Sequence, residues 1–202
     1  IIRNYLDGKK DGEEISWYDN GKTKFIKNFK EGRIVGEYIE WYQNGKKKIS
    51  GFFNEEGIRD GTWTTWHDNY MKNSEGIFNN GNKDKNWKTW YKNGNLKSDY
   101  YYSDNKATGK WTKWFENGSK KAEGLFNQNI PDGKHLAWYE NGQISDEYNY
   151  RNGLLNGKSK IWYENGQLKS EENYINGNLS GINNHWDVNG NLINNKDWIK
   201  AK

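Results

Sequence analysis

Five acidic residues recur at one spacing through the chain and are the first candidates for chemistry. They are Glu75, Asp99, Glu123, Glu147 and Glu171, each 24 residues after the last. Paired carboxylates act as general acid and base where they converge in a concave site. If successive members lie two strands apart in a sheet, they are about 10 Å from one another. Since each has a lysine or threonine as its expected neighbour, the series predicts cross-strand contacts rather than catalysis.

The three histidines, His67, His135 and His185, are the next candidates, for a metal or a general base. His67 occupies a position that is otherwise mostly Tyr or Phe, and His135 stands where other repeats carry Trp. Both therefore read as substitutes at aromatic positions. There is no Cys, and the glycines recur as turn residues rather than as a phosphate-binding loop. The sequence predicts a chain that is not an enzyme, with no cofactor and no metal site.

The residues above belong to a repeat whose signature is aromatic, aromatic, any residue, Asn, Gly. The first aromatic of each copy is Trp17, Trp41, Trp66, Trp90, Trp114, Trp138, Trp162 or Trp186. The spacing is 24 residues except for 25 between the second and third copies, and we place the extra residue in the turn at 54–57. A second aromatic follows each Trp by twelve residues, from Phe29 to Trp198. A Gly usually precedes the next motif, with Lys85 as the exception.

The repeat predicts an all-β fold. Asn-Gly between two β-prone runs is the strongest short hairpin signal and favours a type I′ turn, so each repeat should be a strand, a tight turn, a strand and a looser turn. We expect an elongated single-layer antiparallel β-meander of about eight tandem hairpins, in which each repeat rests only on its neighbours. The whole chain, 1–202, would be a single repeat domain. Within it, 1–12 would be a partial N-terminal unit and 191–202 a C-terminal capping strand.

The register of the hairpins has two solutions. A two-residue turn places Trp90 across from Lys97 and Lys88 across from Asp99. A three-residue turn with a bulge pairs Trp90 with Leu96 instead. We prefer the first, because it puts a lysine stem on an indole and opposite charges face to face.

Composition limits the class of protein. Hydrophobic residues make up 32% of the chain but aromatic residues 16%, including twelve Trp, which predicts a folded, thin structure without a large aliphatic core. The net charge of +4 is too small to indicate nucleic acid binding. No apolar run is long enough for a transmembrane helix. The compartment stays open between cytoplasm and cell envelope of a bacterium, as does the oligomeric state. The first residue, Ile1, and Tyr5 at a second-aromatic position suggest that an upstream segment is missing.

The pattern of residues 157–169, followed by Tyr174 and the Asn-Gly at 176–177, resembles the bacterial MORN-repeat variant. That family includes proteins of the YwqK antitoxin type. The resemblance runs from Tyr5 to Trp198 and departs from the pattern at Tyr70, Lys85 and Asp187. It implies hairpin repeats that bind rather than catalyse, in some cases at protein scaffolds or membrane phospholipids. Choline-binding cell-wall repeats share the Trp-Tyr and Asn/Gly features, but their unit is shorter.

An excess of aromatic residues in the middle repeats suggests where a partner would bind. Trp63, Trp87 and Trp111 occupy one position in repeats 3 to 5, whereas later repeats carry small or polar residues there. With His67, Tyr91 and Phe115, we expect them to form an aromatic patch on one strand face. Such patches mark contact surfaces. The predicted function is a protein-binding scaffold, antitoxin-like, immunity-like or at the bacterial surface. The alternative is binding to a cell-wall glycan or anionic membrane lipid.

Overall fold

The computed structural model describes residues 1–193, all of which lie in strands, turns or irregular segments. The chain divides into two compact units, Ile1–Lys106 and Ala107–Lys202, called here the N-terminal and C-terminal units and described one at a time. Trp198 and most of the predicted capping strand lie outside the described residues. That the repeats form one domain over 1–202 stays a prediction.

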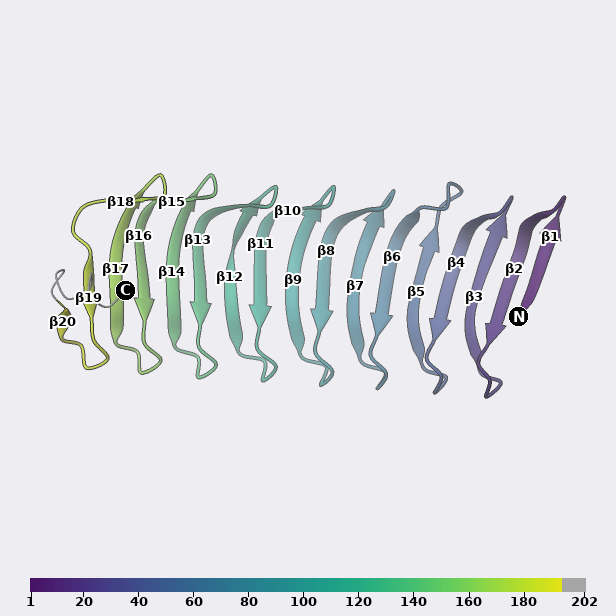
Figure 1. Cartoon of the computed structure of the whole chain (residues 1–202), viewed down its shortest axis with the longest axis horizontal. Coiled ribbons are helices and arrows are strands. Elements are labelled where there is room, and N and C mark those ends of the chain that lie inside the picture. The colour runs from purple at the N-terminus through teal and green to yellow at the C-terminus, as the bar shows by residue number, and fades with distance from the viewer. Residues whose placement is uncertain (194–202) are drawn as a thin grey trace. The chain divides into compact units, whose positions relative to one another are not determined.

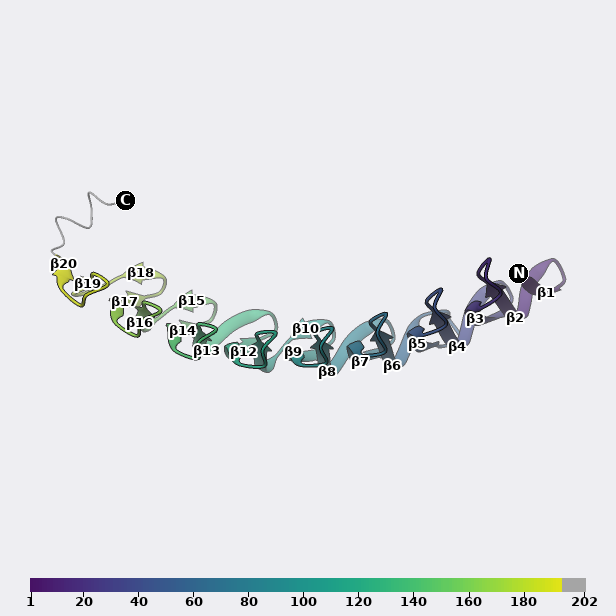
Figure 2. The same ribbon diagram turned by 90° about the horizontal axis from the view of Figure 1, so that it is seen from below.

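In the N-terminal unit nine antiparallel strands follow one another in chain order (Figure 1). They are β1 (Ile2–Leu6), β2 (Lys9–Trp17), β3 (Thr23–Lys30), β4 (Arg33–Trp41), β5 (Lys47–Phe53), β6 (Arg59–Trp66), β7 (Lys72–Asn79), β8 (Asn82–Trp90) and β9 (Leu96–Ser103). Each strand pairs with the one before and the one after it, as in a meander. Within this unit, no other element that the structure describes covers either face of the sheet (Figure 2).

The C-terminal unit continues the same pattern with shorter pieces. Its strands are β11 (Gly109–Trp114), β12 (Lys120–Asn127), β13 (Ile130–Trp138), β14 (Ile144–Arg151), β15 (Leu154–Leu155), β16 (Gly157–Trp162), β17 (Leu168–Ile175), β18 (Asn178–Leu179), β19 (Asn184–Trp186) and β20 (Leu192–Ile193). The two-residue β10 (Lys106–Ala107) lies at the division between the units. Since β14 pairs with both β15 and β16, these two are one interrupted strand. The predicted antiparallel meander of hairpin repeats is confirmed.

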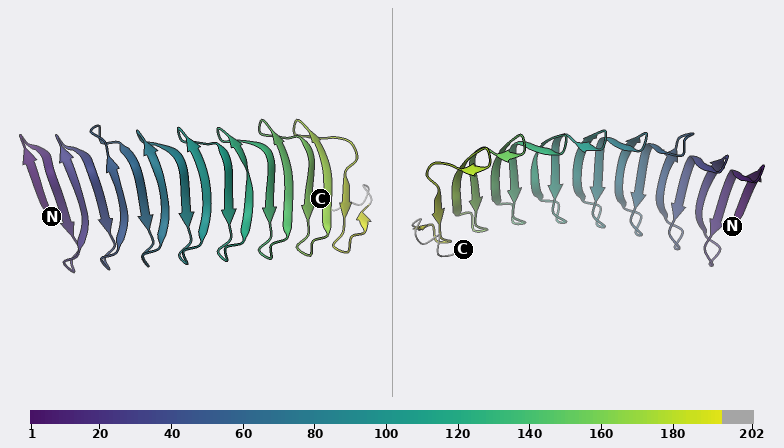
Figure 3. Two further views of the ribbon diagram at one scale, coloured as in Figure 1. Left: turned by 180° about the vertical axis from the view of Figure 1, so that it is seen from behind. Right: turned by 45° about the horizontal axis from the view of Figure 1, so that its top comes forward.

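The prediction of a tight type I′ turn at Asn-Gly and a looser turn between motifs is wrong, because the structure has the two kinds of turn in each other's place. At the Asn-Gly of the motif, only the Gly has positive φ, for example 90° at Gly94. The Gly94 amide donates to the Tyr91 carbonyl, and the Tyr91 amide donates to Asn95. These turns therefore read as type I turns followed by a left-handed glycine. Within the same unit, the two-residue turns with two positive φ values join the opposite ends of the strands, as at Glu31 (50°) and Gly32 (85°). Figure 3 shows the turns at both ends of the strands.

The register predicted for a two-residue turn is confirmed within the strands and is wrong next to the turn. Lys88 does lie across from Asp99, but a bulge follows Thr89, and Trp90 pairs with Leu96. The left-handed glycine adds one residue to the turn, and the extra residue shifts the last pair. The inserted residue of the third repeat does lie in the turn after β5, because Phe53 pairs with Arg59 whereas Phe29 pairs with Ile34.

The glycine that precedes each motif marks a second bulge. At Gly36, φ is 74°, and the β3–β4 register shifts between Lys27 and Asn28. Lys85, which replaces this glycine in the fourth repeat, adopts the same left-handed region with φ 58°. The departure from the sequence pattern therefore leaves the backbone conformation in place.

The core is thin, as the composition predicts. Among residues 1–193 the buried apolar side chains are Phe29, Trp63 and Ala107, and no large side chain is fully enclosed. Side chains alternate between two faces of each sheet. In the N-terminal unit we call the side that carries Trp63 and Trp87 the aromatic face, and the side that carries Glu75 and Lys88 the charged face.

Candidate functional site

In five repeats the second aromatic residue of the motif forms a hydrogen bond to the next hairpin. The Tyr18 hydroxyl donates to the carbonyl of Trp41 at 2.6 Å, and Tyr42 makes the equivalent bond to Trp66 at 2.8 Å. His67 does the same through Nε2, which lies 3.1 Å from the Trp90 carbonyl. Because a carbonyl can only accept, this ring carries its proton on Nε2. The interpretation of His67 as a substitute at an aromatic position is confirmed.

The Asn of the motif performs a similar task at the turn. Its Oδ1 accepts the amide two residues on, as Asn141 does from Gln143 at 2.9 Å. Its Nδ2 donates to the turn of the following hairpin, as Asn141 does to the Glu164 carbonyl at 3.1 Å. The motif is therefore a device for stacking hairpins, and its polar atoms are used within the sheet.

Two of the three extra tryptophans, Trp63 and Trp87, lie over glycine. A Cβ placed on Gly51 would be 2.2 Å from Cδ2 of Trp63, and one on Gly76 would be 2.1 Å from Cδ2 of Trp87. Between them Phe78 meets Trp63 and Trp87 edge-on, with ring centroids 6.1 and 5.0 Å away. Each indole thus fills the space that a side chain would occupy on the neighbouring strand.

Cations cover the exposed sides of these rings. The Arg59 guanidinium lies 4.4 Å from the ring centroid of Trp63, and the Lys83 ammonium lies 4.5 Å from that of Trp87. On the same face, burial and a hydrogen bond to Glu40 raise the pKa of Tyr38 to about 12. The aromatic face is therefore closed over by its own side chains.

The C-terminal unit uses a histidine in the same way. A Cβ on Gly124 would be 2.6 Å from the His135 ring, and the ring meets Phe126 edge-on at 5.8 Å. His135 Nε2 donates to the Leu125 carbonyl at 2.8 Å. His135 is thus the counterpart of Trp63 and Trp87, as the sequence predicts. Trp111 stacks on Phe126 with centroids 5.7 Å apart.

The six residues of the predicted patch are divided between the units. Trp63, His67, Trp87 and Tyr91 lie in the N-terminal unit, and Trp111 and Phe115 in the C-terminal unit. Trp63 is only 5% exposed, and the other five are half-buried. The packing over glycine shows that Trp63 and Trp87 support the sheet. The contact role of the six residues stays a prediction.

The acidic series forms ion pairs with lysines. Glu147 meets Lys134 at 2.9 Å, and Glu171 meets Lys158 at 2.9 Å and Lys160 at 3.1 Å. The two lysines hold the pKa of Glu171 below its usual value. Together with the pairs at Glu75, Asp99 and Glu123, these contacts form what we call the acid–lysine ladder. The prediction of a cross-strand structural role is confirmed.

A row of exposed apolar side chains on the charged face was not predicted from the sequence. In the N-terminal unit it consists of Phe52 (45% exposed), the half-buried Ile77 and Tyr101 (42% exposed). We call these three the apolar row. Leu125, 44% exposed, holds the equivalent position in the C-terminal unit. The available signal was the residue before the second aromatic, which is apolar in repeats 2 to 5 and Asn at 28, 149 and 173.

The apolar row and the rings of the opposite face are linked through the backbone. The indole N–H of Trp63 donates to the Phe52 carbonyl at 3.1 Å, and that of Trp87 donates to Ile77 at 3.0 Å. The bulge opposite Gly51 interrupts the backbone hydrogen bonds between the strands here, so these carbonyls need another donor. Trp63 and Trp87 therefore hold in place the strand segments that present Phe52 and Ile77.

Residues 1–193 hold no group of three His, Asp or Glu side chains placed to bind a metal ion. The same residues contain no helix long and apolar enough to cross a bilayer.

Comparison with known protein families decides the identity of the repeats. Six segments match the MORN repeat variant, namely 10–31, 34–55, 83–104, 107–128, 131–152 and 155–176. Together they cover about two thirds of the chain. The chain belongs to the MORN repeat variant family. No curated protein matches it.

The family match follows the structure of the repeat. Each matched segment of this MORN protein joins the two strands on either side of one Asn-Gly turn, as 34–55 does for β4 and β5. The stretch between 55 and 83 is unmatched and contains the inserted turn residue and Tyr70. MORN repeats are scaffolds that bind proteins or membranes and are not catalytic units.

Proposed function

We propose that this MORN protein is a non-enzymatic scaffold that binds a partner protein through the charged face of its sheet. The observation that carries the proposal is the apolar row of Phe52, Ile77 and Tyr101, which stands among ion pairs on an uncovered sheet face. Large apolar side chains in this setting mark contact surfaces, and a tyrosine among charged neighbours is a favoured hot spot.

The surroundings of the row support a protein partner. Members of the row are two strands apart, or about 10 Å. The polar residues Thr62 and Asn86 on the intervening strands lie across from Ile77 and Tyr101. The Lys88–Asp99 pair, 3.6 Å apart, lies beside Tyr101. Apolar anchors ringed by paired charges are the arrangement found in protein interfaces, where the rim excludes water from the anchors.

The predicted aromatic patch has a place in this proposal. Trp63 and Trp87 act from the opposite face by holding the carbonyls of Phe52 and Ile77. Direct contact by the half-buried rings of His67 and Tyr91, and by Trp111 and Phe115 in the C-terminal unit, is a further part of the proposal.

The test is affinity capture from lysate and envelope fractions of the source organism. The bait is the whole chain, compared with Tyr101→Ser, Ile77→Ser and a matched control, Asn28→Ser. Asn28 holds the same position in the first repeat and is already polar. A protein captured by the parent chain and Asn28→Ser, and lost with Tyr101→Ser, supports the proposal. Equal capture by all four refutes the use of this face.

The identity of the captured material separates the versions of the proposal. A toxin encoded beside this gene supports an antitoxin-like or immunity-like role, and an envelope protein supports a surface role. Recovery of wall glycan or anionic lipid alone would replace the protein-scaffold proposal with a ligand-binding one.

A further inference from the structure

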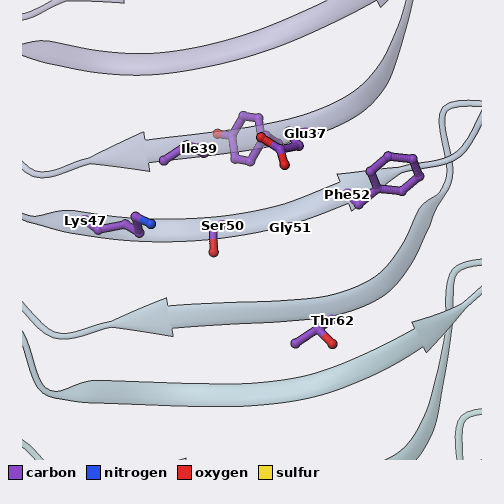
Figure 4. A pocket seen from close by; sticks show the side chains of 8 residues that line it. Glu37, Ile39, Lys47, Ser50, Gly51, Phe52 and Thr62 are labelled. Carbon is purple, nitrogen blue, oxygen red and sulfur yellow. The ribbon is translucent and has the colours of Figure 1, made fainter.

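The charged face of the N-terminal unit contains a hollow of about 430 Å³. It is lined from β4 by Glu37 and Ile39, from β5 by Lys47, Ser50 and Phe52, and from β6 by Thr62 (Figure 4). Figure 4 shows Lys47 toward one end of β5, and Glu37 and Phe52 toward the other. Glu37 and Phe52 are directly paired across the two strands.

The hollow lies where the acid–lysine ladder stops. Ser50 stands at the position that Glu75 and Glu123 hold in later repeats, and Glu37 stands where Lys110 and Lys134 stand. Where both ladder residues are present, they pair across the strands, as Lys110 and Glu123 do at 3.2 Å. In the second repeat the long acid is replaced by a serine, and the base is replaced by an acid. The space is therefore open, with the Glu37 carboxylate toward one end and the Lys47 ammonium toward the other.

Three polar side chains around the hollow are without a partner in the described part of the chain. Among residues 1–193, the side chains of Glu37, Ser50 and Thr62 make no hydrogen bond or ion pair. Beside them the Phe52 ring is 45% exposed. One carboxylate, two hydroxyls and an accessible ring face thus converge on the same space.

We propose that this hollow receives an arginine side chain from an extended segment of the partner protein. This inference rests on the proposed function and names what the partner must present. A guanidinium offers planar N–H donors to the Glu37 carboxylate and to the Ser50 and Thr62 hydroxyl oxygens. Its flat face stacks on the Phe52 ring. The bound guanidinium takes the place of the positively charged lysine that the acid–lysine ladder lacks in this repeat.

Lys47 gives the ligand a direction. Its ammonium lies 5.4 Å from the ring centroid of Trp66, at the turn end of the hollow. A cation is repelled from that end and attracted to the Glu37 end. The arginine therefore enters beside Phe52, with the segment's carbonyl or carboxylate oxygens toward Lys47.

The direct test is a titration of the ¹⁵N-labelled chain followed by NMR. The probe is Nα-acetylarginine methylamide, and the matched ligand is the citrulline equivalent, which has the same shape without the charge. The arginine probe should shift the amide signals of Glu37, Ser50, Phe52 and Thr62, and citrulline should not. Absence of shifts with arginine, or equal shifts with citrulline, would overturn the inference.

Three variants complete the test. Glu37→Gln should raise the dissociation constant of the probe by about fivefold, as expected for loss of about one charge-assisted contact. Ser50→Lys should abolish binding by placing a base beside Glu37 and filling the hollow. Glu13→Gln is the matched control, because Glu13 holds the same position in the first repeat but faces Asn28 instead of a ring. Unchanged binding by Glu37→Gln refutes the arginine site.

The outcomes separate this inference from the proposed function. If capture depends on Tyr101 but the probe does not bind near Glu37, the scaffold stands and the arginine site is wrong. If the probe binds as expected and no partner protein is captured through the apolar row, the hollow is a cation site and the scaffold proposal fails.

Discussion

Replacing Gly51 by alanine tests whether the packing of Trp63 over glycine stabilises the aromatic face of the N-terminal unit. The φ of Gly51 is not in the left-handed region, so the backbone accepts a Cβ there. The obstacle is steric, because that Cβ would lie 2.2, 2.3 and 2.7 Å from three atoms of the Trp63 ring. Carbon atoms pack at about 3.5–4.0 Å, so the ring must move by more than an ångström. Phe53, with its centroid 5.1 Å away, stands in its path.

The magnitude follows from three contributions. Overpacking of this kind costs about 1–3 kcal/mol. Displacing the ring also breaks the Trp63–Phe52 hydrogen bond, 3.1 Å long, which contributes about 1 kcal/mol. The lower entropy of unfolded alanine returns about 0.5–1 kcal/mol. We expect Gly51→Ala to lower the free energy of unfolding by about 2 kcal/mol.

The assay is urea denaturation followed by tryptophan fluorescence, with Ser50→Ala as the control on the opposite face. In the Trp63→Ser background the penalty of Gly51→Ala should disappear, which a double-mutant cycle measures as coupling. The boundary between the sixth and seventh repeats already contains a compensated pair of this kind, with Tyr148 and Ser159 at the equivalent positions. A neutral or stabilising Gly51→Ala, or an undiminished penalty in the Trp63→Ser background, would refute the reasoning.

Three further predictions concern other departures from the repeat. His67→Phe should lose the hydrogen bond to the next hairpin and about 1 kcal/mol, whereas His67→Tyr should keep it, and urea midpoints of the two variants check this. Tyr70→Gly should stabilise the chain by about 1 kcal/mol, because the bulky Tyr70 adopts the left-handed region at φ 78°. A lower melting temperature of this variant would instead mean that the contact between the Lys46 ammonium and the Tyr70 ring, 4.0 Å from the ring centroid, outweighs the strain. Glu14 is 2% exposed; burial disfavours its charge, but hydrogen bonds from two lysines outweigh burial and lower its pKa from 4.5. It therefore stabilises the fold above about pH 4.5 and progressively less as the pH falls below that value, so Glu14→Gln should flatten the acid limb of a stability–pH curve.

Much of the fold follows from local sequence. Asn-Gly turns at a 24-residue period, with strand-forming residues between them, dictate hairpins, and hairpins joined by short turns can only form an antiparallel meander. The ladder at Lys160 and Glu171 was readable for the same reason, since side chains on paired strands alternate with a period of two.

Turn type and surface role needed the tertiary structure. Asn-Gly permits two turn geometries, and the choice depends on the side chain of Asn141 bridging to the next hairpin, which is a contact between repeats. The same holds for the tryptophans. The sequence shows an excess of aromatic residues at Trp63 and Trp87. Only the packing shows that each indole lies on a glycine and donates a hydrogen bond to the carbonyl of Phe52 or Ile77. A one-layer sheet has two faces, so the sequence determined which residues share a face, and cross-strand packing decided which face is closed and which stays exposed.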